Sequence, residues 1–128
     1  MSDVRVVRSP AETLSLQQLP TFVGISEGVG ASGLSLALVI VPPGGEALPH
    51  VHDGFETAIY QLEGRVVTRY GERLEQSVET GPGDFLFIPP GLPHQPVNAS
   101  ETERAVGVIA RTEASEQETA TLYEPPAA

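Results

Sequence analysis

The sequence predicts a single all-β domain, built as a sandwich or a barrel. Short apolar runs recur at intervals of about 8–12 residues, which is the spacing of strands joined by tight turns. The 12 prolines and 13 glycines fall between these runs rather than in one tract, and no convincing helical periodicity interrupts them. A chain of 128 residues with 40% hydrophobic content has material for one small core.

The strongest strand signal is the run 34–41, which alternates at first and then becomes wholly apolar, as a buried strand does. Residues 4–7 predict an edge strand. Residues 9–12 have the composition of a helix start without a periodic continuation, so we expect at most a turn there. A glycine-rich loop is predicted at 28–33. The other predicted strands are 22–25, 57–63, 65–70, 74–79, 85–88, 94–97 and 104–111.

These elements divide the chain into an N-terminal strand or arm (1–21), a barrel (22–111) and an acidic C-terminal tail (112–128). From Thr112 onward the tail carries four acidic residues and no basic one. We expect it to be loosely held, with Leu122 and Tyr123 as the residues that could dock on the body.

Composition excludes several functional classes. The chain has no cysteine and therefore no disulfide framework, thiolate metal site or cysteine nucleophile. Its net charge of −10 argues against nucleic acid or an anionic membrane as a partner. The N-terminus lacks the layout of a signal peptide, and the longest apolar run is too short to cross a bilayer, so we expect a cytoplasmic protein.

The three histidines of the chain all lie at the ends of apolar segments. His50 and His52 are two residues apart, so in a strand they would point to the same face, about 7 Å from each other. His94 follows a Pro/Gly turn, at the place where a returning strand would begin. A single histidine is more often structural, but three in such positions favour a metal site, because imidazole is a common metal ligand.

Two motifs around these histidines resemble those of the cupin superfamily. In the first, Gly44 is followed after five residues by His50-x-His52, and a carboxylate and Gly64 come later. The second has the spacing Gly, five residues, Pro-x-Gly, two residues, His, three residues, Asn, and it is matched at Gly83, Pro89, Gly91, His94 and Asn98. The chain is thus identified as a small single-domain monocupin with a cupin 2 conserved barrel, similar in general look to polyketide cyclases.

The resemblance implies a double-stranded β-helix, or jelly-roll, barrel. It also implies one divalent metal ion inside the barrel, held by His50, His52 and His94 together with a carboxylate. Zinc, manganese, iron and nickel all suit such ligands. Cupins commonly dimerise through edge strands, so we expect a homodimer.

The identity of the carboxylate ligand is left open by the sequence. Counted forward from His52, Glu56 has the family's shorter spacing, but counted back from Gly64 the position falls on Thr57. If Thr57 and Gln61 face inward, Glu56 faces outward unless the strand bulges. We predict Glu56 as the ligand, with a three-histidine site plus water, or an approach by Gln61, as the alternatives.

The family resemblance implies a metal-dependent enzyme that acts on a small oxygenated organic molecule. Cyclisation or isomerisation through a metal-bound enolate is the preferred reaction, because a metal can polarise a substrate oxygen. The alternatives are a non-haem iron(II) dioxygenase and a non-enzymatic binding or sensing module. The metal centre itself, with Glu56 as a candidate member, is the only catalytic group that the sequence indicates. Gln61, Tyr60 and Tyr70 could line a pocket, although each more often belongs to sheet surface or core.

Overall fold

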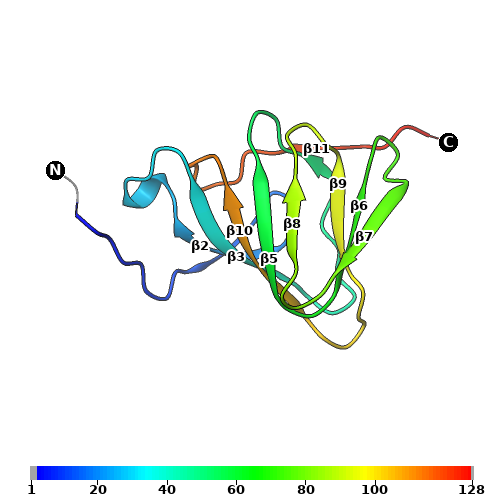
Figure 1. The fold of residues 1–128 in the computed structure, drawn as a ribbon, viewed down its shortest axis with the longest axis horizontal. Coiled ribbons are helices and arrows are strands. Elements are labelled where there is room, and N and C mark those ends of the chain that lie inside the picture. The colour runs from blue at the N-terminus through cyan, green and yellow to red at the C-terminus, as the bar shows by residue number, and fades with distance from the viewer. Residues whose placement is uncertain (1–2, 128) are drawn as a thin grey trace.

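The protein folds as two antiparallel β-sheets packed face to face, in the jelly-roll arrangement that the motifs imply (Figure 1). The structure is a computed structural model and describes residues 3–127. Within that range the regular structure is strand, apart from a single 3-10 turn, η1 (Glu27–Val29). The prediction of an all-β domain is confirmed.

The larger sheet has six strands in the order β1-β2-β3-β10-β5-β8, with β1 and β8 at its edges. Every pair in it is antiparallel. Its strands are β1 (Glu12–Leu14), β2 (Pro20–Ile25), β3 (Ser35–Val41), β5 (Thr57–Glu63), β8 (Phe85–Ile88) and β10 (Ala105–Arg111).

The smaller sheet has five strands in the order β11-β4-β9-β6-β7. Its central strand, β9, pairs with β4 on one side and β6 on the other. Its strands are β4 (His50–Val51), β6 (Val66–Tyr70), β7 (Gln76–Thr80), β9 (His94–Asn98) and β11 (Thr121–Leu122).

Alternation along the strands builds the core between the sheets. In β3 the buried residues are every second one, from Ser35 to Val41, as expected for a strand with one face on the core. The apolar core cluster draws on both sheets and on two connecting segments: Leu19, Val39, Val41, Ala47, Val66, Ala105 and Ile109. This cluster fills one part of the interior and leaves another part to polar side chains.

Asn98, the last residue of the second motif, has a structural role. Its side-chain amide nitrogen lies 3.0, 3.1 and 2.8 Å from the carbonyl oxygens of Val41, Pro42 and Glu103, and its carbonyl oxygen accepts from the Ser100 amide. The residue is buried. It therefore ties the end of β9 to the end of β3 and to the turn before β10.

One prediction near the N-terminus is wrong. Residues 4–7 are not a strand, because Val4 is 95% exposed and lies in an arm outside the paired strands, and the first strand is β1. The strand predicted at 104–111 is β10, which starts one residue later and pairs with β3 on one side and β5 on the other. Strands 57–63 and 85–88 have the predicted bounds.

The C-terminal segment is attached to the body rather than loosely held. β11 pairs with β4, which places Leu122 opposite His50. The Tyr123 amide donates to the Pro49 carbonyl at 2.9 Å, and the Tyr123 hydroxyl donates to the Glu72 carbonyl. Docking at Leu122 and Tyr123 agrees with the prediction for these residues, whereas residue 128 lies outside the described range.

A search of the described residues finds no helix with the length and hydropathy needed to cross a bilayer.

Candidate metal centre

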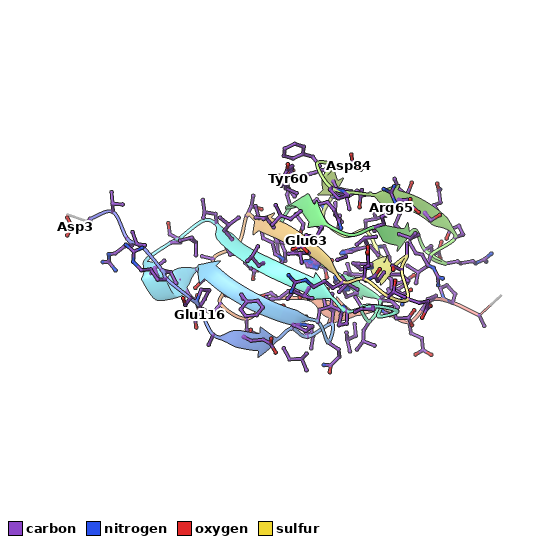
Figure 2. All side chains as sticks on the ribbon, turned by 90° about the horizontal axis from the view of Figure 1, so that it is seen from below. Asp3, Tyr60, Glu63, Arg65, Asp84 and Glu116 are labelled. Carbon is purple, nitrogen blue, oxygen red and sulfur yellow. The ribbon has the colours of Figure 1, made fainter. Side chains whose placement is uncertain are left out.

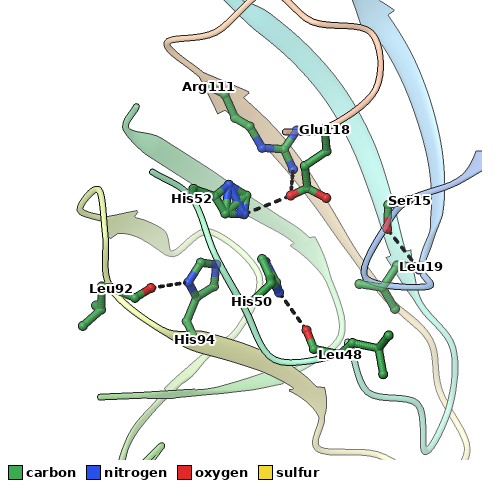
Figure 3. A network of polar contacts seen from close by, with 9 residues as sticks. All are labelled: Ser15, Leu19, Leu48, His50, His52, Leu92, His94, Arg111 and Glu118. Atoms are coloured by element: carbon green, nitrogen blue, oxygen red, sulfur yellow. Dashed lines mark hydrogen bonds and ion pairs between the residues drawn. The ribbon is translucent and has the colours of Figure 1, made fainter. Parts of the chain in front are cut away.

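The three histidines come together at one end of the interior of the barrel (Figure 3). His50 begins β4 and His94 begins β9, and the antiparallel register places these two residues directly opposite each other. His52 follows β4 after one residue. All three are at most 3% exposed, and their candidate ligand nitrogens lie within 4.8 Å of one another.

Backbone carbonyls orient two of the imidazole rings. His50 Nδ1 lies 2.7 Å from the Leu48 carbonyl oxygen, and His94 Nδ1 lies 2.8 Å from that of Leu92. A ring that donates from Nδ1 to a carbonyl carries its free lone pair on Nε2, which is the arrangement usual for metal-binding histidine. The same contact, to the carbonyl two residues upstream, thus sets the tautomer at both positions.

His52 lacks such a contact. Its two ring nitrogens are buried and neither has a hydrogen bond, although Nε2 lies 2.9 Å from a carboxylate oxygen of Glu118. Buried polar groups left unpaired cost about 1–3 kcal/mol each, and a bound cation would remove that cost. A space of about 20 Å³ bordered by the histidines is large enough for one ion or water. The residues present therefore fit a divalent metal ion.

Burial keeps all three rings neutral at ordinary pH. It lowers the pKa of His50 and that of His52 from 6.5 to about 3, with a further contribution from the neighbouring His94. The pKa of His94 is lowered as well, mainly by burial and despite its contact with Leu92. Because metal ligation requires neutral imidazole, the site is set for metal binding without a proton to displace.

The second motif's turn is hydrogen-bonded to the first motif. The Gly91 amide donates to the His52 carbonyl at 2.8 Å, and Gly91 has a φ of 78°, a conformation that glycine adopts without strain. The glycine of the Pro-x-Gly corner therefore helps to fix the chain at His52, which no strand pairing holds.

Two residues that the sequence analysis did not single out complete the interior polar group. Arg111 ends β10, and Glu118 comes from the C-terminal segment; both are buried. Glu118 Oε2 lies 3.0 Å from Arg111 Nη2 and 2.9 Å from His52 Nε2 (Figure 3). Burial raises the pKa of Glu118, and the Arg111 guanidinium acts in the opposite direction.

A signal for this pair was present in the sequence. Arg111 has the same strand parity as Ile109, so it is expected to point into the barrel. A buried guanidinium needs a carboxylate partner. The sequence could indicate that such a partner exists, but not which of the four acidic residues of the tail it is.

The residues proposed for the fourth ligand position lie in different places. Glu56 is exposed, just before β5, and the metal-ligand group among the described residues consists of the histidines. Thr57 and Gln61 are buried, as strand parity predicts. Thr57 borders the space between the histidines. Gln61 bonds to Thr80 and to the Glu63 carbonyl, and lines a separate cavity of about 50 Å³.

The two tyrosines proposed for the pocket also differ. Tyr60 lies on the outer side of β5, where its ring is 4.7 Å from that of Phe85 (Figure 2). Tyr70 is half-buried and lines a cavity of about 360 Å³ that His94 also lines. Its other lining residues are mostly apolar: Thr68, Val78, Leu86, Phe87, Ile88, Pro89 and Leu92.

A barrel of two antiparallel sheets with three buried histidines inside defines a cupin. The family model described as "Cupin domain" matches residues 37–109, and the chain belongs to this family.

The individual relatives are functionally diverse. The chain is 36% identical over 86 residues to germin-like protein subfamily T member 3 of Arabidopsis thaliana. The aligned region covers 65% of this chain and 38% of that protein. It spans less than half the length of the curated relatives it matches.

Two solved structures illustrate the range. The polyketide cyclase RemF of Streptomyces resistomycificus is 27% identical, with a TM-score of 0.67 over 98% of this chain and 89% of that one. Oxalate decarboxylase of Bacillus subtilis, a protein with Mn(II) centres, has a TM-score of 0.72 over 90% of this chain and 30% of that one. At 17% identity the latter likeness shows the fold alone.

Proposed function

We propose that this cupin is a metal-dependent enzyme that cyclises or isomerises a small oxygenated organic molecule. The observation that carries the proposal is the position of His94, which belongs to the histidine group and also lines the apolar cavity. A substrate in this cavity would lie beside the metal site. When bound there, a divalent ion supplies Lewis-acid polarisation of a substrate oxygen.

The cavity has the properties of a small-molecule site. Its volume of about 360 Å³ is within the usual range of about 300–1,000 Å³ for ligand pockets, and its walls are mainly apolar. It lies between β8 of one sheet and β6 and β7 of the other. Its walls would exclude water from the substrate and align the flat face of a ring or enol against Leu86 and Ile88.

The chain's own residues would position the metal through neutral imidazole rings and the substrate through hydroxyl groups. His50 and His94 present Nε2 toward the centre, because their Nδ1 atoms are held by backbone carbonyls. Tyr70 and Thr68 are the hydroxyl-bearing residues of the cavity and can orient a substrate oxygen. The likeness to a polyketide cyclase over nearly the whole chain supports cyclisation as the reaction.

The proposal is tested with protein purified without a histidine tag and loaded with zinc, manganese, nickel or iron(II). Each form is incubated with a panel of linear and aromatic β-dicarbonyl compounds, and products are followed by mass spectrometry and NMR. Conversion at unchanged mass, or with loss of water only, is expected. Oxygen consumption with the iron form would instead indicate the dioxygenase, and tight substrate binding without turnover would indicate a binding module.

We also propose a homodimer, with edge strand β8 in the interface. β8 exposes Phe85 (82%) and Phe87 (57%), an apolar pair on a strand that pairs with β5 on one side and is the edge of the sheet on the other. Light scattering after size exclusion should give twice the chain mass, and Phe85→Ser should shift the equilibrium toward monomer. A parent protein of monomer mass at micromolar concentration would refute this. Cytoplasmic localisation stays a prediction.

A further inference from the structure

We infer that Glu118 supplies the fourth ligand of the metal centre, so that the C-terminal segment is part of the site. The inference rests on the metal-binding part of the proposed function and not on the reaction. It assigns the carboxylate role to a residue that lies 24 positions after the last histidine, outside both histidine motifs.

The C-terminal segment is fixed on both sides of Glu118. Before it, the Glu27 amide donates to the Ala114 carbonyl at 2.6 Å, and the Thr112 amide donates to the Glu56 carbonyl at 3.1 Å. After it, β11 pairs with β4, the strand that begins with His50. The segment therefore passes over the end of the barrel where the histidines lie, and its one buried acidic side chain points inward (Figure 3).

The contact between Glu118 and His52 has the separation of two ligands on one ion. Glu118 Oε2 lies 2.9 Å from His52 Nε2, yet this ring nitrogen has no hydrogen bond, so the two atoms are close without being aligned as donor and acceptor. Ligand atoms that are each about 2.1 Å from an ion, at angles between 90° and tetrahedral, are about 3.0–3.4 Å apart. A small side-chain rotation would bring both atoms onto a common ion.

Arg111 serves as a positioning residue. Its guanidinium contacts Oε2 at 3.0 Å and leaves Oε1 buried without any partner. A buried carboxylate normally uses both oxygens, because an unpaired one keeps its full desolvation cost. The unpaired Oε1, one of the unpaired His52 nitrogens and the 20 Å³ space are therefore neighbouring features that one cation would satisfy together.

Charge also favours a carboxylate here. Three neutral imidazoles do not offset a dication, and the buried Arg111 adds a further positive charge nearby. The Glu118 carboxyl group is the acidic group that contacts this centre, at His52 and Arg111, and 4% of its side chain is exposed. Glu56, by contrast, is exposed to solvent, whereas the three histidines are buried.

The test is a metal titration of the protein and of three single variants. Glu118→Gln removes the charge and keeps the size; Glu116→Gln is the matched control at an exposed position two residues away; Glu56→Gln tests the competing ligand. Zinc affinity is measured against a chromogenic chelator after far-UV circular dichroism has shown that each variant is folded. We expect Glu118→Gln to weaken binding at least 10-fold, and the other two to stay within 2-fold of the parent.

A second measurement uses cobalt(II) in place of zinc. The visible absorption of the cobalt protein reports coordination, and it should change in Glu118→Gln and not in Glu116→Gln. Hydrogen exchange in residues 112–123 should slow when metal binds to the parent protein, since the ion would hold Glu118 in place.

Three outcomes would overturn the inference: parent-like affinity and cobalt spectrum in Glu118→Gln, a 10-fold loss in Glu56→Gln instead, or equal losses in Glu118→Gln and Glu116→Gln. If the parent protein binds metal and His94→Ala does not, the proposed function survives each of these outcomes. A parent protein that binds no metal after reloading would refute the proposed function itself.

Discussion

The histidines and Glu118 occupy one small volume, but different kinds of structure hold them there. His50 and His94 begin two paired strands, and backbone carbonyls fix their rings. Glu118 lies in a segment without strand pairing between β10 and β11, and its carboxylate is held by Arg111. The histidine half is therefore defined by the sheet, whereas the carboxylate half depends on an ion pair and on the docking of a two-residue strand.

The buried ion pair should show the largest effect on stability. Arg111→Met leaves the Glu118 charge buried without its partner, and such changes cost about 3–5 kcal/mol. The matched control is Arg65→Met, because Arg65 pairs with Glu79 on the surface, where an ion pair contributes about 0–1 kcal/mol. Chemical denaturation of the metal-free proteins measures both. Equal losses would mean that the two pairs are energetically alike.

The two halves should respond to pH in opposite directions in the metal-free protein. The pKa values of His50 and His52 are lowered to about 3, so between pH 6.5 and 3 the unfolded chain binds more protons, and stability falls as pH falls. Near pH 5 this amounts to about 3 kcal/mol per pH unit for the two rings. The raised pKa of Glu118 has the opposite effect on stability. Between pH 4.5 and the raised pKa of the folded state, the folded protein binds more protons at Glu118 than the unfolded chain does, so this group stabilises the fold as pH falls. Glu118→Gln should therefore steepen the loss of stability in acid, and an unchanged slope would contradict these assignments.

The strand that carries His94 should depend on Asn98. Asn98→Ala removes the donor shared by three carbonyls and should cost about 2 kcal/mol, because the Val41 carbonyl loses its partner in a buried place. Urea unfolding measures the loss. The Val41 carbonyl belongs to β3 of the other sheet, so we expect the variant to unfold in one cooperative transition. A change below about 0.5 kcal/mol would show that water replaces the amide.

The smallest effect is expected at the docked end of the C-terminal segment. Tyr123→Pro removes the amide that donates to Pro49 and should cost about 1 kcal/mol, with a several-fold loss of zinc affinity if docking positions Glu118. Tyr123→Phe keeps this amide and removes the hydroxyl contact with the Glu72 carbonyl at the exposed surface, so its zinc affinity should stay close to that of the parent. Equal affinities in all three proteins would mean that β11 does not support the site.

The same contrast explains what the sequence could predict. The resemblance of the two motifs to those of cupins implied the barrel and the three-histidine group, and strand parity predicted the inward side chains of Thr57 and Gln61, because parity is a short-range property. Glu118 depends on where a non-periodic segment runs after β10, and the local sequence does not specify that path. The arm at residues 4–7 was misassigned for a related reason: its apolar residues alternate as in a strand, but no partner strand lies beside them.

The central position of β10 has a consequence for biosynthesis. This strand pairs with β3 and β5, yet it is the last strand of the larger sheet to leave the ribosome. Until residues 105–111 have emerged, β3 and β5 lack their shared neighbour, and apolar side chains such as Val39 and Ile59 stay open to solvent or to chaperones. Folding of the larger sheet should thus await synthesis of residues 105–111, and the contact of Glu118 with His52 can form only after that.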